Sequence, residues 1–446
     1  MNIIGPNSDE THKKTRASLL PPIRNVLTDQ WIEATARRLG KYRRKCRFDT
    51  VVTLLSCILQ HTLGLSVRNI EDSLALSAVE LAPHFRADGA DFCRARLALP
   101  LALFRETLRF LGLNIQSSNG QLWRGLTVYF VDGTTLPVFN SKQNRAAFGA
   151  SSNQNGASRL PIARVVMLVS AGAIIDLVCG PYAASELRLF APLLRNLAPN
   201  SLVVGDMLYN TYYNFASARA RGSHMLCKSR MDRKGKVVEV LGKRDAVREW
   251  ERPRRAQSVF SAGWETLPKT LPVREIAYTV RLPYRHEYVL TLTTTLLDPN
   301  QYPVEEVVAL YLSRWNIELD FRTLKGIHGW NRLHCKTPQS VYREVFSGAL
   351  AFNAVRLMMA KSGERIRTLS HERACCTLIE TAWRMADAPA VRLPELYRRA
   401  LAVIARAILE TSDRPPEPRL LAYNLRRFPF LKLTRANWRK AHALSS

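Results

Sequence analysis

The chain has 446 residues, 47% of them hydrophobic and 9% aromatic, which excludes a disordered chain and allows two or three domains with buried cores. Its 65 Lys and Arg against 37 Asp and Glu give a formal net charge of +28, a charge that suits a polyanion. The most apolar run, 160–179, is broken by Arg164 and Asp176, so no stretch reaches the length of a bilayer span. We therefore expect nucleic acid, and no membrane, as the partner.

The N-terminus and the cysteines indicate an intracellular protein. Asp9 and Glu10 stand where a secretion signal would have its apolar core. The eight cysteines form no CxxC pair. Reduced thiols are expected, and a zinc module is not.

The polar residues 1–22 are expected to form a loose arm, and 23–122 has the pattern of a helical domain, broken at Pro83 and Pro100. This domain holds a dense basic run. We interpret the run as a DNA-backbone contact, with Arg43, Arg44 and Lys45 as its centre; a solvated helix face is the alternative. Its members are Arg37, Arg38, Lys41, Arg43, Arg44, Lys45 and Arg47.

Residues 123–230 change character and are typical of an α/β unit. Short β-branched and aromatic runs alternate with helical segments, which predicts a mixed sheet with helices packed on it. The expected strands are LTVYFVD, RVVMLVS, AIIDLVC, SLVVGD and HMLCKS, the second and third paired across Ala171-Gly172, and the expected helices are SELRLFAPLLRNL and TYYNFASARA.

Residues 231–300 interrupt this pattern with the runs KVVEVLG, IAYTVRL and YVLTLTTTL, which predict an inserted β-rich subdomain. The helical pattern resumes at Pro303, whose fixed φ suits a first helical turn. We expect residues 301–390 to complete the α/β unit and 391–446 to be a basic helical region. No internal repeat is evident.

Four polar residues, Tyr311, Arg314, Glu318 and Lys325, lie at offsets of 0, 3, 7 and 14 within LYLSRWNIELDFRTLK. On a continuous α-helix they fall within an arc of about 60°. Apolar residues flank the arc, which predicts that it faces inward, where charges must be paired or bound to a ligand. The alternative is an i,i+4 ion pair on a solvated helix. The flanking residues are Val308, Leu312, Trp315 and Leu319 on one side and Leu310, Ile317 and Phe321 on the other, and Ser313, Asn316, Asp320 and Thr323 are expected to face water.

Asp132 closes the expected strand LTVYFVD, and Asp206 closes SLVVGD. Open α/β sheets bind ligands at the carboxyl ends of their strands, although Asp before Gly is also a common turn former. Together with Glu318, the two aspartates could hold two divalent ions about 4 Å apart. Oxygen ligands favour Mg²⁺, for which we expect Mn²⁺ to substitute. Arg314 and Lys325 could then hold neighbouring phosphates.

These residues carry a resemblance. The chain resembles bacterial insertion-sequence transposases of the Asp-Asp-Glu (DDE) class, in family four, which is marked by a Y-x2-R-x3-E-x6-K (YREK) signature. Tyr311, Arg314, Glu318 and Lys325 match all four positions. VDGTTLPVF with NRAAFGASSNQNG is similar to the first-aspartate region, VVGDMLYN to the second, and FCRARLALP to the N-terminal segment. Met207 departs from the family, which often has Arg after the second aspartate.

The resemblance implies an α/β fold: an RNase H-like catalytic core with an inserted β-rich subdomain, preceded by a helical N-terminal domain. It implies cleavage at terminal inverted repeats and strand transfer into target DNA by Asp132, Asp206 and Glu318. Tyr311 and Arg314 would hold the 5′ phosphate of the non-transferred strand. Trp250 or Trp264 could stack on an extruded base in a hairpin step; a core or surface aromatic is the alternative.

The resemblance also implies a homodimer on double-stranded DNA and a bacterial cytoplasmic protein associated with the nucleoid. Two other functions stay open at this point. One is a DNA-binding protein of transposase descent whose catalysis has decayed. The other is a metal-dependent nuclease that cuts without strand transfer.

Overall fold

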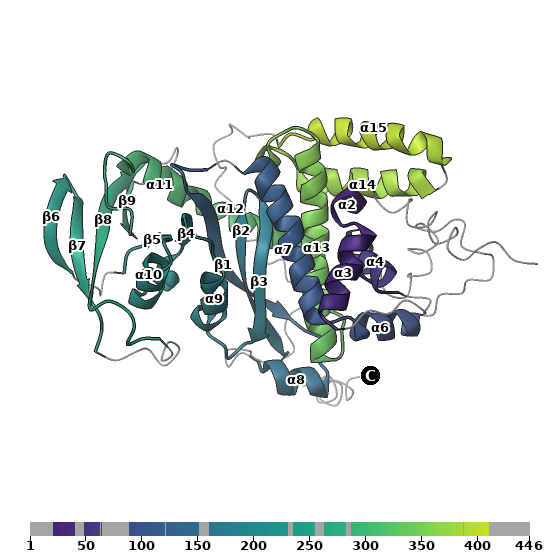
Figure 1. Ribbon diagram of the computed structural model, residues 1–446, viewed down its shortest axis with the longest axis horizontal. Coiled ribbons are helices and arrows are strands. Elements are labelled where there is room, and N and C mark those ends of the chain that lie inside the picture. Colours follow the sequence, from purple (N-terminus) through teal and green to yellow (C-terminus); the bar gives the residue numbers. More distant parts are fainter. Residues whose placement is uncertain are drawn as a thin grey trace, which may run out of the picture.

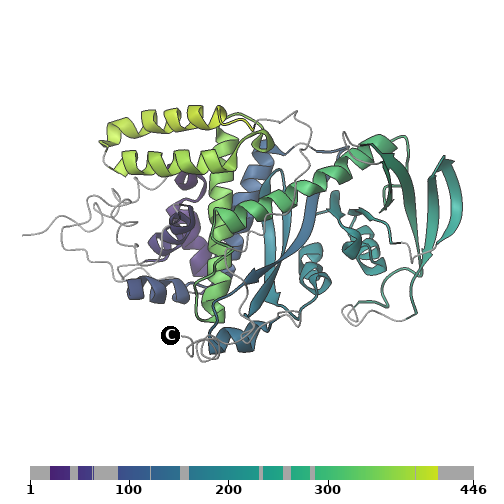
Figure 2. The same cartoon turned by 180° about the vertical axis from the view of Figure 1, so that it is seen from behind.

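The structure, a computed structural model, describes residues 21–40, 49–62, 64, 89–120, 122–150, 160–230, 235–254, 263–281, 287–386 and 388–409. Within these ranges a nine-stranded mixed sheet forms the centre, with helices on both faces (Figures 1 and 2). The strand order is β3-β2-β1-β4-β5-β9-β8-β7-β6. The strands are β1 Thr127–Pro137, β2 Ile162–Ser170, β3 Ala173–Pro181, β4 Ser201–Gly205, β5 His224–Lys228, β6 Lys236–Gly242, β7 Asp245–Glu251, β8 Thr270–Val280 and β9 Tyr288–Thr294.

The middle of the sheet combines parallel and antiparallel pairs. β1 runs parallel to β4, with Phe130 opposite Val204, and β4 runs parallel to β5. β2 is antiparallel to both β1 and β3. The β2–β3 hairpin turns at Ala171 and Gly172, whose φ angles of 49° and 80° match a two-residue turn with both central residues left-handed. The strands and the turn that the sequence predicted here are confirmed.

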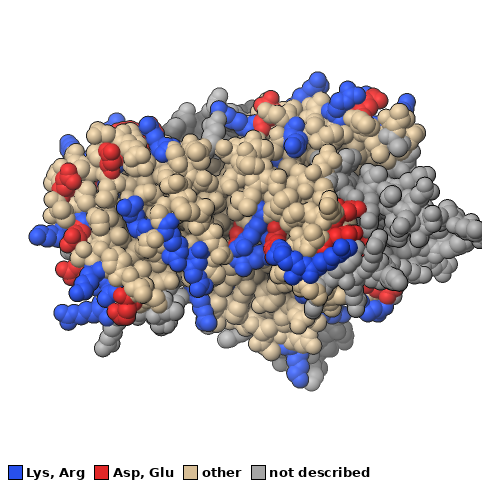
Figure 3. Space-filling view, viewed as in Figure 1, with Lys and Arg blue, Asp and Glu red and all other residues tan. Residues whose placement is uncertain are grey.

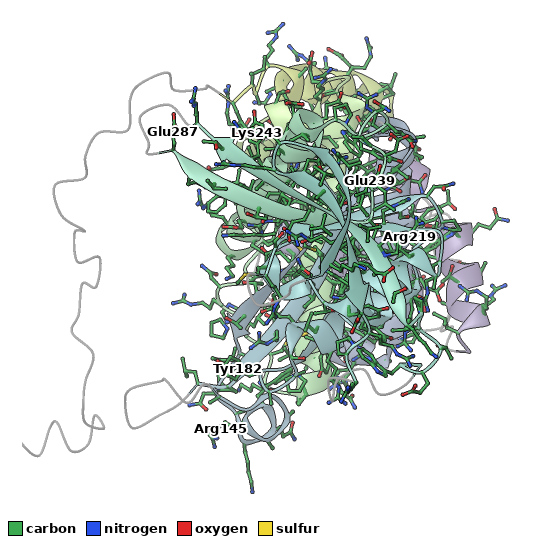
Figure 4. The ribbon with its side chains drawn as sticks, turned by 90° about the vertical axis from the view of Figure 1, so that its left-hand side faces the viewer. Arg145, Tyr182, Arg219, Glu239, Lys243 and Glu287 are labelled. Atoms are coloured by element: carbon green, nitrogen blue, oxygen red, sulfur yellow. The ribbon has the colours of Figure 1, made fainter. Side chains whose placement is uncertain are left out.

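The strands between 231 and 300 extend this sheet instead of forming a second one, because β9 pairs with β5 in antiparallel register. The run DAVREWE forms β7, a strand that the sequence analysis did not predict. Its charged residues hide the alternation that marks a strand. One of them, Asp245, accepts two hydrogen bonds from the fully buried Arg274 of β8, at 2.8 and 2.6 Å. Glu239 on β6 and Lys243 after it lie at this end of the molecule (Figure 4).

Helices cover both faces of the sheet. α9 (Glu186–Arg195) packs on β2 and β3, and α10 (Tyr212–Arg219) packs on β5 (Figure 1). α11 (Val304–Leu312) contacts β8, and α12 (Asn316–Gly326) contacts β1, on the side seen in Figure 2. The strand β1 therefore lies between a helical layer that contains α9 and one that contains α12.

The long helix α13 (Pro338–Lys361) connects the sheet to the other helices. Asn353 on α13 accepts a hydrogen bond from the Ile174 amide at 2.9 Å and donates one to the Ile174 carbonyl at 2.7 Å, so it satisfies backbone groups of the edge strand β3. α13 also packs on most of the remaining helices. The remaining helices, whether or not they contact α13, are α2 Pro21–Val26, α3 Asp29–Arg38, α4 Thr50–Thr62, α6 Gly89–Ala98, α7 Leu101–Asn119, α8 Lys142–Phe148, α14 His371–Ala386 and α15 Leu393–Ala405.

One apolar cluster extends from Ile23 to Ile404 and includes residues of α4, α7, α13 and β1–β3. The N-terminal helices therefore share a core with the sheet within the described residues. The division into 23–122, 123–230, 231–300, 301–390 and 391–446 stays a prediction.

Candidate active site

Asp132 lies in the middle of β1, so the expectation that it closes its strand is wrong. β1 continues to Pro137 because β2 pairs with it from Phe130 to that residue, with Asp132 opposite Met167. The parallel neighbour β4 stops earlier, at Gly205. Asp132 therefore lies beside the carboxyl end of β4, the kind of edge that open sheets use for ligands.

Asp206 follows β4 directly and begins a 3₁₀ turn, η2 (Met207–Tyr209). Its Oδ1 accepts a hydrogen bond from the Leu208 amide at 2.8 Å, which fixes the carboxylate at the start of the turn. Met207, where the family often has Arg, is 48% exposed. Asp132, in the middle of β1, and Asp206, directly after β4, therefore lie at the same place, where β4 ends beside the longer β1.

The four signature residues do not lie on one continuous α-helix, as the sequence analysis expected. Tyr311 is on α11, Arg314 is in a 3₁₀ turn, η4 (Ser313–Trp315), and Glu318 and Lys325 are on α12. At this break the Ser313 hydroxyl donates to the Leu310 carbonyl at 2.6 Å, and the Asn316 amide to the Ser313 carbonyl at 2.9 Å. Such side-chain bonds compete with the regular helical pattern.

Arg314 nevertheless joins the signature to the sheet. Its guanidinium donates to Asp132 Oδ2 at 3.3 Å and to Glu318 Oε1 at 3.1 Å. The side chains of Arg314 and Asp132 are 15% and 17% exposed, and that of Glu318 is 34% exposed. Acidic residues far apart in the sequence therefore share one cation in a largely enclosed position.

Asp132 is surrounded by charges of both signs. Burial raises the pKa of Asp132 to about 6, against the lowering effects of the Gly133 amide and of Arg314. Asp206 and Glu186 are near enough for their negative charges to raise this pKa as well. The structure therefore brings Asp132, Asp206 and Glu318 into one neighbourhood.

Tyr311 and Lys325 lie at the two ends of the signature segment. Burial raises the pKa of Tyr311 to about 12, and the neighbouring Asp206 is among the groups that add to it. Burial lowers the pKa of Lys325. Tyr311 is thus buried on α11, and Lys325 is half-buried on α12.

Two expectations about the surroundings of the signature are wrong. Leu312, Trp315 and Leu319 are 38%, 55% and 38% exposed instead of forming a buried wall, because the 3₁₀ turn rotates this side of the segment outward. Asp320, expected to face water, is fully buried. It accepts hydrogen bonds from Arg356 at 2.9 Å and from Arg367 at 2.7 Å.

The sequence analysis missed two residues beside the aspartates. Glu186 begins α9, and Tyr209 ends the turn that Asp206 begins. Tyr209 is fully buried, and its hydroxyl donates to Glu186 Oε2 at 3.4 Å. No local signal marks Glu186, because a glutamate after Ser185 is an ordinary way to start a helix.

The donor set suits a hard divalent ion, since carboxylate oxygens are the side-chain ligands that such ions prefer. However, the described residues contain no group of three or more His, Cys, Asp or Glu side chains already placed to hold a metal ion. Asp132 and Glu318 close around the Arg314 guanidinium instead. A metal would therefore have to take these oxygens from Arg314.

The remaining sequence-predicted residues lie elsewhere. Arg43, Arg44 and Lys45 are outside the described residues. Trp250 and Trp264 are 4% and 5% exposed, with their rings near Phe215 and Tyr212 at centroid distances of 5.2 and 6.2 Å. Both tryptophans are core aromatics in this structure, the alternative that the sequence left open.

Comparison with known proteins shows similarity to transposases. The family model "Transposase DDE domain" matches residues 123–354, more than half of the chain. The transposase InsG for insertion sequence element IS4 of Escherichia coli (strain K12) is 25% identical over 318 residues, which cover 69% of this chain and 70% of that protein. A cryo-EM structure of the piggyBac transposase synaptic complex with hairpin DNA has a TM-score of 0.43 at 10% identity, and covers 88% of this chain and 86% of that one.

The chain belongs to the transposase DDE domain family. It is a transposase, an enzyme that cleaves DNA, and the family generally uses a divalent metal ion. The family that the sequence suggested is thereby confirmed, whereas its YREK branch stays a prediction. Among the helices in the described ranges, none combines the length and apolar character needed to cross a bilayer.

Proposed function

We propose that this transposase cleaves DNA at the ends of a mobile element and transfers the freed strands into target DNA, with Asp132, Asp206 and Glu318 as its catalytic residues. The observation that carries the proposal is the shared guanidinium of Arg314, which contacts Asp132 on β1 and Glu318 on α12. Carboxylates that hold the same metal ions must lie close together. Asp132 and Glu318 lie close enough to contact one guanidinium, that of Arg314.

We also propose that β1–β5 and the flanking helices form an RNase H-like core, in which β6–β9 are the inserted part. The strand order β3-β2-β1-β4-β5, with antiparallel β1–β3 and parallel β1, β4 and β5, supports this assignment. The insertion lies between the strand that precedes Asp206 and the helix that carries Glu318.

Asp132, Asp206 and Glu318 would hold Mg²⁺, with Mn²⁺ as a substitute. When bound, the ions lower the pKa of the attacking water or 3′-hydroxyl and stabilise the charge on the leaving oxygen. The protein contributes carboxylates in the middle of β1, directly after β4 and on α12. Asp132 must be ionised for this role, and its pKa, which burial raises to about 6, allows that at neutral pH.

Arg314, Tyr311 and Lys325 would bind DNA phosphates beside the carboxylates. Arg314 can exchange its two acidic partners for phosphate oxygens, which match its planar fork. Lys325, whose pKa burial lowers, would gain a partner for its charge. Tyr311 could donate its hydroxyl proton in a hydrogen bond to the same phosphate.

The DNA partner would be double-stranded, with terminal inverted repeats and a target site, bound by a homodimer that holds both ends. Lys and Arg side chains form patches on the surface shown in Figure 3, as a polyanion partner requires. Arg43, Arg44 and Lys45 would add salt-dependent affinity. Two other members of the basic run, Arg37 and Arg38, already pair with Glu33 and Glu106.

The proposal is tested with Asp132→Ala, Asp206→Ala and Glu318→Ala. We expect each change to abolish Mg²⁺-dependent cleavage of a DNA end while binding of that DNA survives, because the carboxylates hold metal and not DNA. Gel assays of cleavage and of binding measure both. Glu239→Ala, at an exposed acidic residue of β6, is the matched control and should cut normally.

Full cleavage by any of the three variants would refute the catalytic assignment. An unaltered protein that binds element ends but never cuts them would support a decayed DNA-binding protein. Cut ends without joined products would indicate a nuclease without strand transfer.

A further inference from the structure

A fourth acidic side chain, Glu186, lies on the other side of β1 from α12. It is the first residue of α9, and the side chain is 18% exposed. Its Oε1 accepts a hydrogen bond from Arg164 of β2 at 2.7 Å. The Arg164 guanidinium also lies over the ring of Tyr182, 5.1 Å from its centroid, near the α8 end of the sheet (Figure 4). The Arg164 guanidinium, which itself packs on Tyr182, therefore fixes one carboxylate oxygen of Glu186.

The other oxygen of Glu186 lies against the backbone next to Asp132. A Cβ atom at Gly133 would come within 2.4 Å of Oε2, so a larger residue at position 133 would displace the carboxylate. The Gly133 amide donates to Asp132 Oδ1 at 2.8 Å. Glu186 thus packs on the peptide that orients the Asp132 side chain.

The same oxygen also contacts the turn that follows Asp206. It accepts the Tyr209 hydroxyl at 3.4 Å, and the Tyr209 ring packs edge-on against Phe190 of α9, with centroids 5.1 Å apart. Tyr209 belongs to the turn η2, which the Asp206 carboxylate caps through the Leu208 amide. The position of Tyr209 therefore constrains the turn that carries Asp206.

We propose that Glu186 is a positioning residue that sets the separation of Asp132 and Asp206 and so the metal affinity of the site. The two aspartates stand on different strands, and Glu186 contacts the residue after the first and the turn after the second. Residues that orient metal ligands are typically worth 10–100-fold in affinity. The proposal rests on the proposed function, in which these aspartates hold the metal.

A rival explanation is that Glu186 acts through its charge alone, by making the site more attractive to cations. Two substitutions separate these explanations. Glu186→Asp keeps the charge but shortens the reach to Gly133 and Tyr209. Glu186→Gln keeps the reach, and its amide oxygen can still accept hydrogen bonds, but it removes the charge.

The experiment measures Mn²⁺ affinity of the full-length protein without DNA, by electron paramagnetic resonance of free Mn²⁺. We expect Glu186→Asp to weaken binding by about tenfold and Glu186→Gln to weaken it clearly less. Glu305→Gln removes an exposed first-turn acid from α11 and is the matched control for helix stability. Thermal unfolding of every variant, which we expect to stay near that of the unaltered protein, separates a local change from a general loss of stability.

Unchanged affinity in Glu186→Asp, or a larger loss in Glu186→Gln than in Glu186→Asp, would overturn the positioning role. A loss of affinity that merely follows a lower unfolding temperature would do the same. Asp132→Ala and Asp206→Ala are measured in parallel. If they bind Mn²⁺ as the unaltered protein does, the proposed metal site itself has failed, an outcome distinct from a failure of the Glu186 assignment.

Discussion

Arg314 lies where a metal ion would need to be, between Asp132 and Glu318. A guanidinium and a divalent cation compete for the same oxygens, because both are positive and both need carboxylate partners. DNA phosphate can resolve the competition by drawing Arg314 away. Metal binding and DNA binding should therefore favour each other at this site.

We predict that Arg314→Gln raises the Mn²⁺ affinity of the DNA-free protein by about tenfold, because a competing positive charge is removed. Electron paramagnetic resonance of free Mn²⁺ measures the affinity. Arg322→Gln, at an exposed position of the following helix α12, is the control and should change little. Weaker Mn²⁺ binding in Arg314→Gln would contradict the competition.

At the scale of the element, α12 is held on two sides. Glu318 faces the sheet, whereas Asp320 is fully buried between Arg356 of α13 and Arg367 in the 3₁₀ turn η5 (Ile366–Thr368). Burial lowers the pKa of Arg356 to about 10, and the charge of Asp320 opposes this effect. The arrangement fixes the helix that presents Glu318.

We predict that Asp320→Ala lowers the free energy of unfolding by about 3–5 kcal/mol, because it leaves Arg356 buried without its acidic partner. Urea denaturation at pH 7.5 measures this change. Arg322→Ala, exposed on the same helix, should stay within about 0.5 kcal/mol of the unaltered protein. A loss below about 1 kcal/mol would show that water or another group satisfies Arg356.

At the scale of the molecule, buried histidines join the N-terminal helix α4 to α14. His328 Nε2 lies 2.8 Å from His371 Nε2 of α14, and His328 Nδ1 lies 3.2 Å from the His61 carbonyl of α4. Burial lowers the pKa of His328 to about 4 and that of His371 well below its usual value. Both rings are therefore neutral in the folded protein at neutral pH.

This burial predicts a loss of stability in mild acid. Below about pH 6.5 the unfolded chain binds protons at these histidines while the folded protein does not, so stability falls as pH decreases towards 4. Each histidine contributes a slope of about 1.4 kcal/mol per pH unit. We expect His371→Gln to reduce the pH dependence of the free energy of unfolding by the contribution of one histidine.

Urea denaturation of the unaltered protein and of His371→Gln at pH 7, 6 and 5 measures the two slopes. Because His328 contacts His371, the difference between the slopes reports the loss of His371 together with any change in the titration of His328. Identical slopes would show that protonation of His371 is not linked to unfolding.

The sequence predicted the strands β1 to β5, the β2–β3 hairpin and the family, because each depends on patterns within a few residues. Alternating β-branched runs mark the strands, and Ala171-Gly172 marks a turn. The sequence did not reveal the strand β7 because its charged residues pair with residues of the neighbouring strand β8, as Asp245 does with Arg274. Periodicity cannot reveal such a partner.

Local sequence patterns also predicted only part of the candidate site. Asp132, Asp206 and the signature residues could be chosen by motif, and the structure brings Asp132 and Glu318 to one guanidinium. Helical spacing misplaced Asp320, since a polar residue looks water-facing until Arg356 and Arg367 are known to lie against it. Glu186 had no signal because its contacts come from two other elements, Gly133 from the strand β1 and Tyr209 from the turn η2.

By itself, the sequence determined the strong positive charge, the order of the main elements and the membership of a transposase family, because composition and local periodicity are properties of the chain. Only the tertiary structure decided which side chains meet. Arg314 lies between two acids, Asp320 lies between two arginines, and the Glu186 carboxylate lies against the backbone at Gly133. Pairing between residues as far apart as Asp132 and Arg314, 182 positions in sequence, depends on how helices and strands pack, and that packing is fixed jointly by the whole core.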